Sequence, residues 1–571
     1  MSPGPVSDMT QLTFLEQIDD TVELAKLFFA NKFEECAQKF KEKRDISMYH
    51  HFGQCLLTTI QGILTFDKNV MGVAIDEIEV CLTVYTKKYL KQKSGFFSTK
   101  NYDQYSDEEI HAELSYNILL NLSSLVNVVY DQSFTGFVKS AYRITNAYMG
   151  YKECLKILET RNCWSHPRLR EHFEALLKHF LGIIEIVIAY MPPKLSRLLE
   201  FIGFSGQLET GMQYLETSFY IKNTFGNLAS SVVLMFLNIF AEFFYGLGNL
   251  NIPLMKDIHS NCVRNFPNSS FSAMSEAVIQ TADCKFDEVV NTLEQFLETS
   301  EEQPQYIQFV MCWMKSWAYA FLCDWNKAAE NMKHLLNCPW APAMFHYIYG
   351  TFLFAAKSGK DFDENVDRVA LIFEKVPSLR LKIGGRKLFH DDFVVNRSQK
   401  YFSSSRKYFL PTYELFYIWN YFSLISKNKK SMETILQDIK LKLESIEDVN
   451  SMYDDYAMLL FLKAVVLKYS REETEARKIF LQIIQNGKKL HEDNIVLAHS
   501  MYEVALMFRD KGNTAECREW LKKAKKNQHG YLTERLLKFR IDLLLNHVDS
   551  KYNDLSDSSK DDFEQIENTQ L

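Results

Sequence analysis

Apolar residues recur along most of this chain at the spacing of an amphipathic helix, and short polar stretches separate one such segment from the next. Within these segments a four-position pattern repeats: a small residue, a second small residue twelve positions later, and bulky apolar residues four and seven positions after that. Small side chains let two helix backbones approach, and the later two residues share one helical face. The pattern predicts pairs of antiparallel helices that cross at the small residues.

The pattern recurs at a nearly constant interval. The second crossing residues Cys36 and Ala74 are 38 positions apart, and Ala476 and Cys517 are 41 apart. Tetratricopeptide repeats have a period of about 34 residues and HEAT-type repeats one of about 40–47, so the interval favours tetratricopeptide-like pairs with lengthened helices or loops. Another helical bundle is the alternative, because four-position matches also arise by chance. The copies begin at Leu24, Gly62, Ala277, Ser316, Ala464 and Ala505.

The composition agrees with a helical fold. The 571 residues include only 21 Gly and 12 Pro, too few for the many turns of a β-sandwich, barrel or propeller. Hydrophobic residues make up 47% and aromatic residues 14% of the chain, which excludes disorder for most of its length. We expect an all-α fold, a tetratricopeptide-like α-α superhelix (a solenoid of antiparallel helix pairs) with irregular insertions.

Breaks in the helical pattern and clusters of Pro and Gly mark the expected boundaries. A loop at 91–107 is expected to end at a helix N-cap, Ser106 or Asp107. We expect a disordered N-terminus at 1–10, an N-terminal helical half with tetratricopeptide-like pairs at 11–265, central tetratricopeptide-like repeats at 266–376, an irregular insertion at 377–411, C-terminal tetratricopeptide-like repeats at 412–545 and a disordered acidic tail at 546–571.

Charge and cysteine usage narrow the class of protein. The net charge is −7 and basic runs such as 522–526 are short, so we expect no nucleic-acid partner. Eleven cysteines form no Cys-x-x-Cys pair, and several, including Cys81, lie in apolar runs, as is typical of reduced thiols in a cytosolic protein. The first residues lack a secretory signal. We expect a cytoplasmic protein, and association with an organelle membrane surface stays open.

One apolar stretch, from Leu228 to Tyr245, is nearly long enough to span a bilayer. It contains Asn238 and Glu242, which are four positions apart and share one helical face. Because a carboxylate in lipid is costly, we interpret the stretch as a buried helix with one polar edge and expect no transmembrane span. Contact of this stretch with a membrane surface stays open.

Motifs of catalysis and metal binding are incomplete. The run that begins at Asp361 starts like a calcium loop, but Val366 and Ile372 replace its required Gly and Glu. We interpret the pair His50 and His51 as lacking a Cys or carboxylate at ligand spacing, and His491 as lacking the second His of a zinc protease motif. We therefore expect no catalytic residues, no cofactor and no metal, although catalytic side chains that converge only in space are an open alternative.

The tail carries two candidate sites. Ser556, Ser558 and Ser559 stand among carboxylates, which suits phosphorylation by an acid-directed kinase. The last residues, Thr569, Gln570 and Leu571, have the Ser/Thr-x-apolar form that adds as a strand to a PDZ domain. A solvated tail without either function is the alternative.

Several blocks of sequence are long and rare, above all RLLEFIGFSG at 197–206, RSQKYFSS at 397–404 and VPSLRLKIGGRK at 376–387. With these the chain resembles the tetratricopeptide repeat protein 39 family over nearly its full length, as a diverged animal member. The resemblance implies a helical solenoid and an intracellular adaptor with roles in lipid homeostasis and protein turnover, and it implies no catalytic residues. The segment 170–177 replaces a Gly-rich stretch of the family, and Glu276 stands where a Gly is usual.

The expected function is that of a non-enzymatic scaffold or adaptor that binds other proteins. The clamp that some tetratricopeptide modules use for chaperone tails needs Lys, Arg and Asn on inward faces. The corresponding stretches, 311–317 and 459–465, are largely apolar, so we expect no chaperone-tail clamp. The tryptophans near the first stretch are interpreted as core. A peripheral membrane or lipid-associated adaptor is the alternative, and an unrecognised enzyme is a third.

Overall fold

Helices make up nearly all of the computed structural model. The N-terminus 1–10 and the tail 546–571 lie outside the described residues, as do most of the block 197–206 and residues 241–245 of the long apolar stretch. The structure describes residues 12–88, 101–131, 133–189, 206–240, 250–301, 303–356, 362–383, 386–387, 390–403, 410–491, 495–527 and 532–545.

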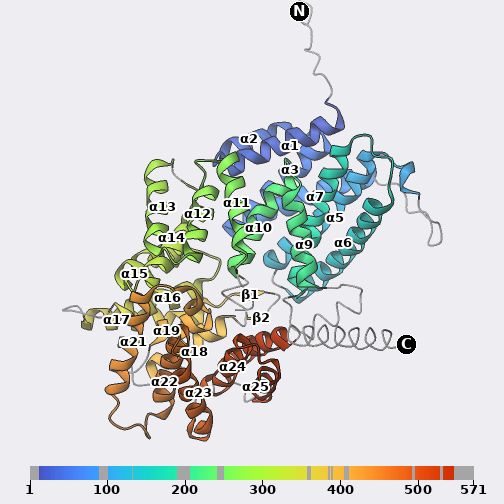
Figure 1. Cartoon of the computed structure of the whole chain (residues 1–571). Coiled ribbons are helices and arrows are strands. Elements are labelled where there is room, and N and C mark those ends of the chain that lie inside the picture. Colours follow the sequence, from blue (N-terminus) through green and yellow to red (C-terminus); the bar gives the residue numbers. More distant parts are fainter. Residues whose placement is uncertain are drawn as a thin grey trace, which may run out of the picture.

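The first half of the chain forms long helices in one part of the molecule (Figure 1). They are α1 (Phe14–Phe29), α2 (Phe33–Lys43), α3 (Met48–Thr65), α4 (Lys68–Lys88), the 3-10 turn η1 (Tyr102–Gln104), α5 (Asp107–Tyr130), α6 (Phe134–Thr160), α7 (Pro167–Ala189), α9 (Leu208–Tyr220), α10 (Phe225–Phe240) and α11 (Ile252–Asn265).

The second half continues the superhelix and carries one small hairpin (Figure 1). Its helices are α12 (Ser270–Ala282), α13 (Phe286–Thr299), α14 (Gln305–Phe321), α15 (Trp325–Lys333), η3 (His334–Asn337), α16 (Pro342–Ala355), α17 (Phe362–Lys375), η4 (Val376–Leu379), α18 (His390–Ser403), α19 (Pro411–Ile418), α20 (Tyr421–Ile425), α21 (Lys429–Glu444), α22 (Tyr453–Tyr469), α23 (Glu473–Gln485), η5 (Gly487–Lys489), α24 (Ile495–Asp510) and α25 (Thr514–Lys526); the strands are β1 (Lys382–Ile383) and β2 (Arg386–Lys387). Residues 534–545 are also helical.

The expected helix pairs form, and they cross where the small residues stand. The six pairs are α1/α2, α3/α4, α12/α13, α14/α15, α22/α23 and α24/α25, and both crossing residues of each pair are buried. In two pairs a side chain also bonds across the crossing: the Cys36 thiol donates to the Leu24 carbonyl at 3.3 Å, and the Ser316 hydroxyl to that of Ala328 at 2.7 Å. The prediction of an all-α superhelix built from antiparallel pairs is confirmed.

Five of these pairs share one turn. The second residue after the first helix is left-handed, with φ between 60° and 74°, and the amide that follows it donates to a carbonyl five residues earlier, as in a Schellman cap. The five residues are Asn31, Cys284, Cys323, Arg471 and Gly512. Glycine is the residue that usually takes this conformation, so the turns could not be recognised from Gly positions alone.

The span 377–411, predicted as an irregular insertion, contains the helix α18 and the β1–β2 hairpin in addition to irregular residues. Val394 and Tyr401 of α18 are buried in the core, and the Arg397 guanidinium pairs with the Glu414 carboxylate of α19 at 2.7 Å. This helix was overlooked because its apolar face is short and charged residues interrupt it.

The apolar stretch from Leu228 lies in α10 as far as the structure describes it. Leu228 and Leu234 are buried, and the Asn238 side chain accepts a hydrogen bond from the Asn251 amide at 3.2 Å. These residues agree with a buried helix that has one polar edge. Among the described helices, none has the length and the apolar character that crossing a membrane requires.

Candidate functional site

The site residues predicted in the tail cannot be placed. Ser556, Ser558, Ser559 and the terminal residues 569–571 lie outside the described residues. Both the phosphorylation site and the PDZ-binding terminus therefore stay predictions.

The stretches compared with a chaperone-tail clamp lie mostly in the core. In α14, Met311 and Trp317 are buried, and Lys315 is largely covered, with its Nζ 3.7 Å from a Glu294 carboxylate oxygen. In α22, the residues from Leu459 to Val465 are buried except for Lys463, which is half-buried. Neither stretch presents a row of exposed cationic and amide side chains.

Of the tryptophans interpreted as core from the sequence, Trp317 is buried, and the others are partly buried against the same core. The Trp317 ring lies 4.6 Å from the Tyr421 ring and 5.3 Å from the Trp419 ring, measured between centroids. Trp313 is partly buried against the same cluster. Trp340 has a second role, because its indole N–H donates to the Leu64 carbonyl at 2.8 Å. This ring therefore joins the end of α3 to the turn before α16.

The best-formed cavities of the described residues are small. One, among α1, α3 and α7, has a volume of about 20 Å³ and is lined mainly by apolar side chains, including Ile18, Phe52 and Leu176. The other, beside the Arg397–Glu414 pair, has a volume of about 10 Å³. Each is close to the size of one water molecule, whereas small-molecule sites measure about 300–1,000 Å³.

Exposed apolar side chains gather on three consecutive helices that pack side by side. Helices α4, α5 and α6 contact one another, and the Arg143 guanidinium of α6 pairs with the Glu79 carboxylate of α4 beside the Ser123 hydroxyl of α5. Among the side chains of these helices that the structure describes, eight large apolar ones are more than a third exposed, including Tyr142 at 70%. We call them the α4–α6 apolar surface: Val73, Val80, Val84, Leu125, Tyr130, Val138, Tyr142 and Met149.

This surface was missed from the sequence, although a signal for it exists. Val73, Val80 and Val84 stand at helical spacing on α4, on a face different from that of the buried Ala74, Ile78 and Cys81. When a helix has apolar residues on two faces, the sequence pattern does not show which of the two faces is buried and which is exposed. Only the packing of α4 shows which face is covered.

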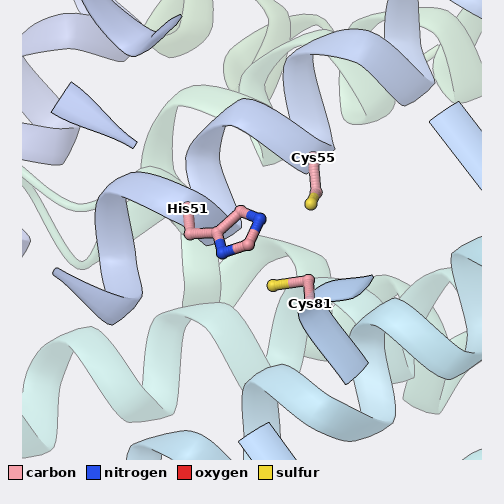
Figure 2. A group of neighbouring side chains, drawn as sticks. All are labelled: His51, Cys55 and Cys81. Atoms are coloured by element: carbon pink, nitrogen blue, oxygen red, sulfur yellow. The ribbon is translucent and has the colours of Figure 1, made fainter. Parts of the chain in front are cut away.

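A compact polar cluster lies between α3 and α4. One ligand-capable atom of each of His51, Cys55 and Cys81 lies within 4.8 Å of those of the other two. Figure 2 shows the imidazole and both sulfur atoms pointing toward one common space. Both cysteines are completely buried, and His51 is half-buried.

The sequence interpretation of His51 was wrong about its neighbours. Cys55 follows one helical turn later on α3, which puts both side chains on one face, and the crossing at Gly62 and Ala74 brings Cys81 of α4 against them. Cys81 was recognised only as an apolar position of the repeat pattern. The cluster could not be recognised from the sequence because Cys81 is far from His51 along the chain.

The three groups polarise one another. Hydrogen bonds from the Cys55 thiol and then from His51 lower the pKa of Cys81 to about 6, although burial acts in the opposite direction. The same contacts with Cys81 raise the pKa of Cys55 and of His51. A thiolate at Cys81 is therefore the favoured ionised form of the pair, and thiolate and imidazole are the donors that bind zinc and related metals.

Comparison with known proteins identifies relatives over most of the chain. Residues 23–470 match the family model described as Iml2/Tetratricopeptide repeat protein 39. The chain is also 24% identical to tetratricopeptide repeat protein ttc-39B of Caenorhabditis elegans over 543 residues, which cover 94% of this chain and 93% of that protein. The resemblance drawn from the sequence blocks is thereby confirmed.

Proposed function

Because the chain belongs to the Iml2/tetratricopeptide repeat protein 39 family, we propose that it is a non-enzymatic scaffold that binds other proteins. Stacked helix pairs offer long surfaces suited to a helix or an extended segment of a partner. The observation that carries the proposal here is the α4–α6 apolar surface, since large exposed apolar side chains gathered on helices that pack together are typical of interaction sites.

The chemistry of this surface favours an amphipathic helix of the partner. Val138, Tyr142 and Met149 follow one face of α6 over about 16 Å, the length of three helical turns. The exposed valines of α4 form a second row at helical spacing, and α4 and α6 both pack on α5. A row of this kind accepts the apolar positions of a docked helix. Tyr142 is the expected anchor, because an exposed Tyr contributes a large apolar ring and a hydroxyl.

Proximity labelling in cells tests the proposal. The triple variant Val80→Ser, Tyr142→Ser, Met149→Ser is expected to lose a defined subset of the proteins labelled by the wild type. The matched control changes Leu371 and Leu441 to Ser, which are 60% and 54% exposed on α17 and α21. Equal labelling by the triple variant and the wild type would contradict a role for this surface, provided that both fold with equal circular dichroism.

The same proposal includes a role in lipid homeostasis or protein turnover and a cytoplasmic location, on the basis of the family resemblance. It also includes the absence of a nucleic-acid partner, on the basis of the net charge of −7.

We also propose that the chain does not bind acidic chaperone tails. A fluorescence titration with such a peptide is expected to give no saturable binding, and micromolar affinity would overturn this part.

The tail is proposed as a second, separable binding element. Thr569, Gln570 and Leu571 suit a PDZ domain, and phosphorylation at Ser556, Ser558 and Ser559 would make the tail more anionic. Proximity labelling with a chain that ends after Asn546 distinguishes the partners of the tail from those of the helical body. If the shortened chain labels the same proteins as the full chain, the tail is not a binding element.

A peripheral membrane adaptor is the second candidate function, and α10 carries it. Phe236 is 61% and Val232 39% exposed, and because they stand four positions apart, both lie on one face of the helix. Flotation of the purified protein with liposomes, compared between the wild type and Phe236→Ser, tests this function. Wild-type protein that stays at the bottom of the gradient would exclude it.

A further inference from the structure

The cluster of His51, Cys55 and Cys81 is unusual for its place in a helix pair. It occupies the interface between α3 and α4, where Ile78, one turn from Cys81, packs as an ordinary core residue. Purely apolar side chains could fill this interface without the free-energy cost of burying polar groups. Instead one imidazole nitrogen and two sulfur atoms meet within 4.8 Å of one another.

A fourth candidate donor stands one turn of α4 before Cys81. Glu77 precedes Cys81 by one turn of α4 and therefore projects from the same face of the helix. Its Oε2 atom is buried and has no hydrogen-bond partner. A buried carboxylate oxygen without a partner is costly, so a cation at this position would relieve that cost.

We propose that His51, Cys55 and Cys81 bind a zinc ion, with the Glu77 carboxylate as the fourth ligand. Two sulfurs, one imidazole nitrogen and one carboxylate oxygen form a donor set that suits tetrahedral zinc. With Zn–S bonds of about 2.3 Å and Zn–N bonds of about 2.0–2.1 Å, ligand atoms around one zinc lie about 3.5–3.8 Å apart. The donor atoms of His51, Cys55 and Cys81 already lie within 4.8 Å of one another, so small rotations bring these three to this geometry. Glu77 is not within that distance of all three, so its side chain must turn further toward the ion.

The bound zinc is structural in this proposal. It cross-links α3 to α4, about two helical turns from the crossing at Gly62 and Ala74. The half-buried edge of His51 gives the ion a route of entry, whereas both thiols are closed to solvent. Binding to the native state alone stabilises it by mass action, so the melting temperature rises with the zinc concentration.

Cobalt substitution of the reduced, full-length protein tests the site. We expect one Co²⁺ per chain, with thiolate-to-cobalt charge-transfer absorption in the near ultraviolet and the visible bands of four-coordinate cobalt. Titration with Zn²⁺ should displace the cobalt. The absence of a thiolate-dependent band in the wild type would overturn the proposal. A disulfide between Cys55 and Cys81 that forms even under reducing conditions would overturn it as well.

Variants separate this site from adventitious thiol binding. Cys81→Ser and His51→Gln are each expected to lower zinc affinity by more than about 100-fold, because they remove a direct ligand. Cys517→Ser, which changes an equally buried thiol at a helix crossing in α25, is the matched control and should bind zinc as the wild type does. A loss in Cys517→Ser as large as that in Cys81→Ser would contradict the assignment.

Glu77→Gln tests the fourth ligand. The amide keeps the shape of the side chain and removes its charge, so we expect weaker zinc binding with the charge-transfer band retained. Zinc affinity equal to that of the wild type would overturn the assignment of Glu77. In every variant, the circular dichroism spectrum without metal shows whether the fold is intact.

Discussion

At the scale of single residues, the turns of the helix pairs carry a small conformational cost. Four of the five left-handed turn residues have a side chain, and for such residues this conformation costs about 1–2 kcal/mol relative to the right-handed one. Cys284 and Cys323 are partly covered by the core, so their side chains contribute packing in return. Arg471, with φ of 68°, is exposed, and its side chain has no comparable contact in the structure.

We therefore predict that Arg471→Gly stabilises the protein. Glycine takes the left-handed conformation without the clash of a Cβ atom, which should raise the free energy of unfolding by about 0.5–1 kcal/mol. Denaturant unfolding measures the change. Arg471→Ala is the control and should have little effect, since it keeps the Cβ; a Gly variant no more stable than the Ala variant would refute the argument.

At the scale of elements, α7 is the helix on which α9 and α10 pack most closely. A Cβ atom added at Gly211 of α9 would lie 2.6 Å from Ile186 and 2.9 Å from the Gly182 carbonyl of α7. One added at Gly226 of α10 would lie 2.5 Å from the Ala175 carbonyl. A backbone carbonyl lies within 3 Å of both positions, in addition to the Ile186 side chain at Gly211. Glycine at these positions therefore permits the close packing of α9 and α10 on α7.

Gly211→Ala should therefore destabilise the fold by about 1–3 kcal/mol, because α9 must move away from α7. Gly72→Ala is the matched control: it is also a helical glycine, but its nearest neighbour would be the Tyr130 ring at 3.8 Å. There the higher helix propensity of Ala should give a gain of up to about 1 kcal/mol. Thermal unfolding of both variants checks the opposite signs.

At the scale of the whole molecule, the beginning and the middle of the superhelix are not independent. In a simple solenoid each repeat contacts only its neighbours. Here the Asn31 side chain, in the turn between α1 and α2, accepts hydrogen bonds from the amide and hydroxyl of Ser270 at the start of α12, at 3.0 and 2.8 Å. The Trp340 bond to Leu64 is a second such link. These contacts tie the first helices to the middle of the chain.

Buried histidines also make the stability of the whole molecule depend on pH. Burial lowers the pKa of His111, His179 and His499 to about 3 and that of His172 to about 4, below the ordinary 6.5. The unfolded chain therefore takes up protons below pH 6.5, while the folded chain does not. Stability is complete above pH 6.5 and decreases as the pH falls toward 3–4.

We predict a loss of about 2 kcal/mol for each of these histidines between pH 7.5 and pH 5. His179→Asn tests one contribution, because Asn keeps a polar contact near the Ser230 hydroxyl, which lies 2.9 Å from the His179 Nδ1. This variant should show a shallower decrease of stability with pH than the wild type. His166→Asn, at an exposed position, should leave the slope unchanged; equal slopes in all three proteins would contradict the prediction.

The helix pairs could be predicted because their signals are local. Gly62 and Ala74, or Ser316 and Ala328, stand twelve positions apart, and this spacing places them at the crossing of any two helices joined by a short turn. The N-cap expected at Ser106 or Asp107 is Ser106, and its signal is local too, since its capping box with Glu109 spans three residues. Helix α18 was not predicted, because its burial depends on its contacts with α16 and α19, which lie outside its own sequence.

The sequence by itself determined the all-α class, the antiparallel pairs and the family. Only the tertiary structure decided that Cys81 joins His51 and Cys55, that α4 to α6 expose an apolar surface, and that Asn31 meets Ser270 from 239 positions away. The physical reason is that helix periodicity is set by neighbours in the chain, whereas the face that a helix covers and the partner that it meets depend on the packing of all helices together.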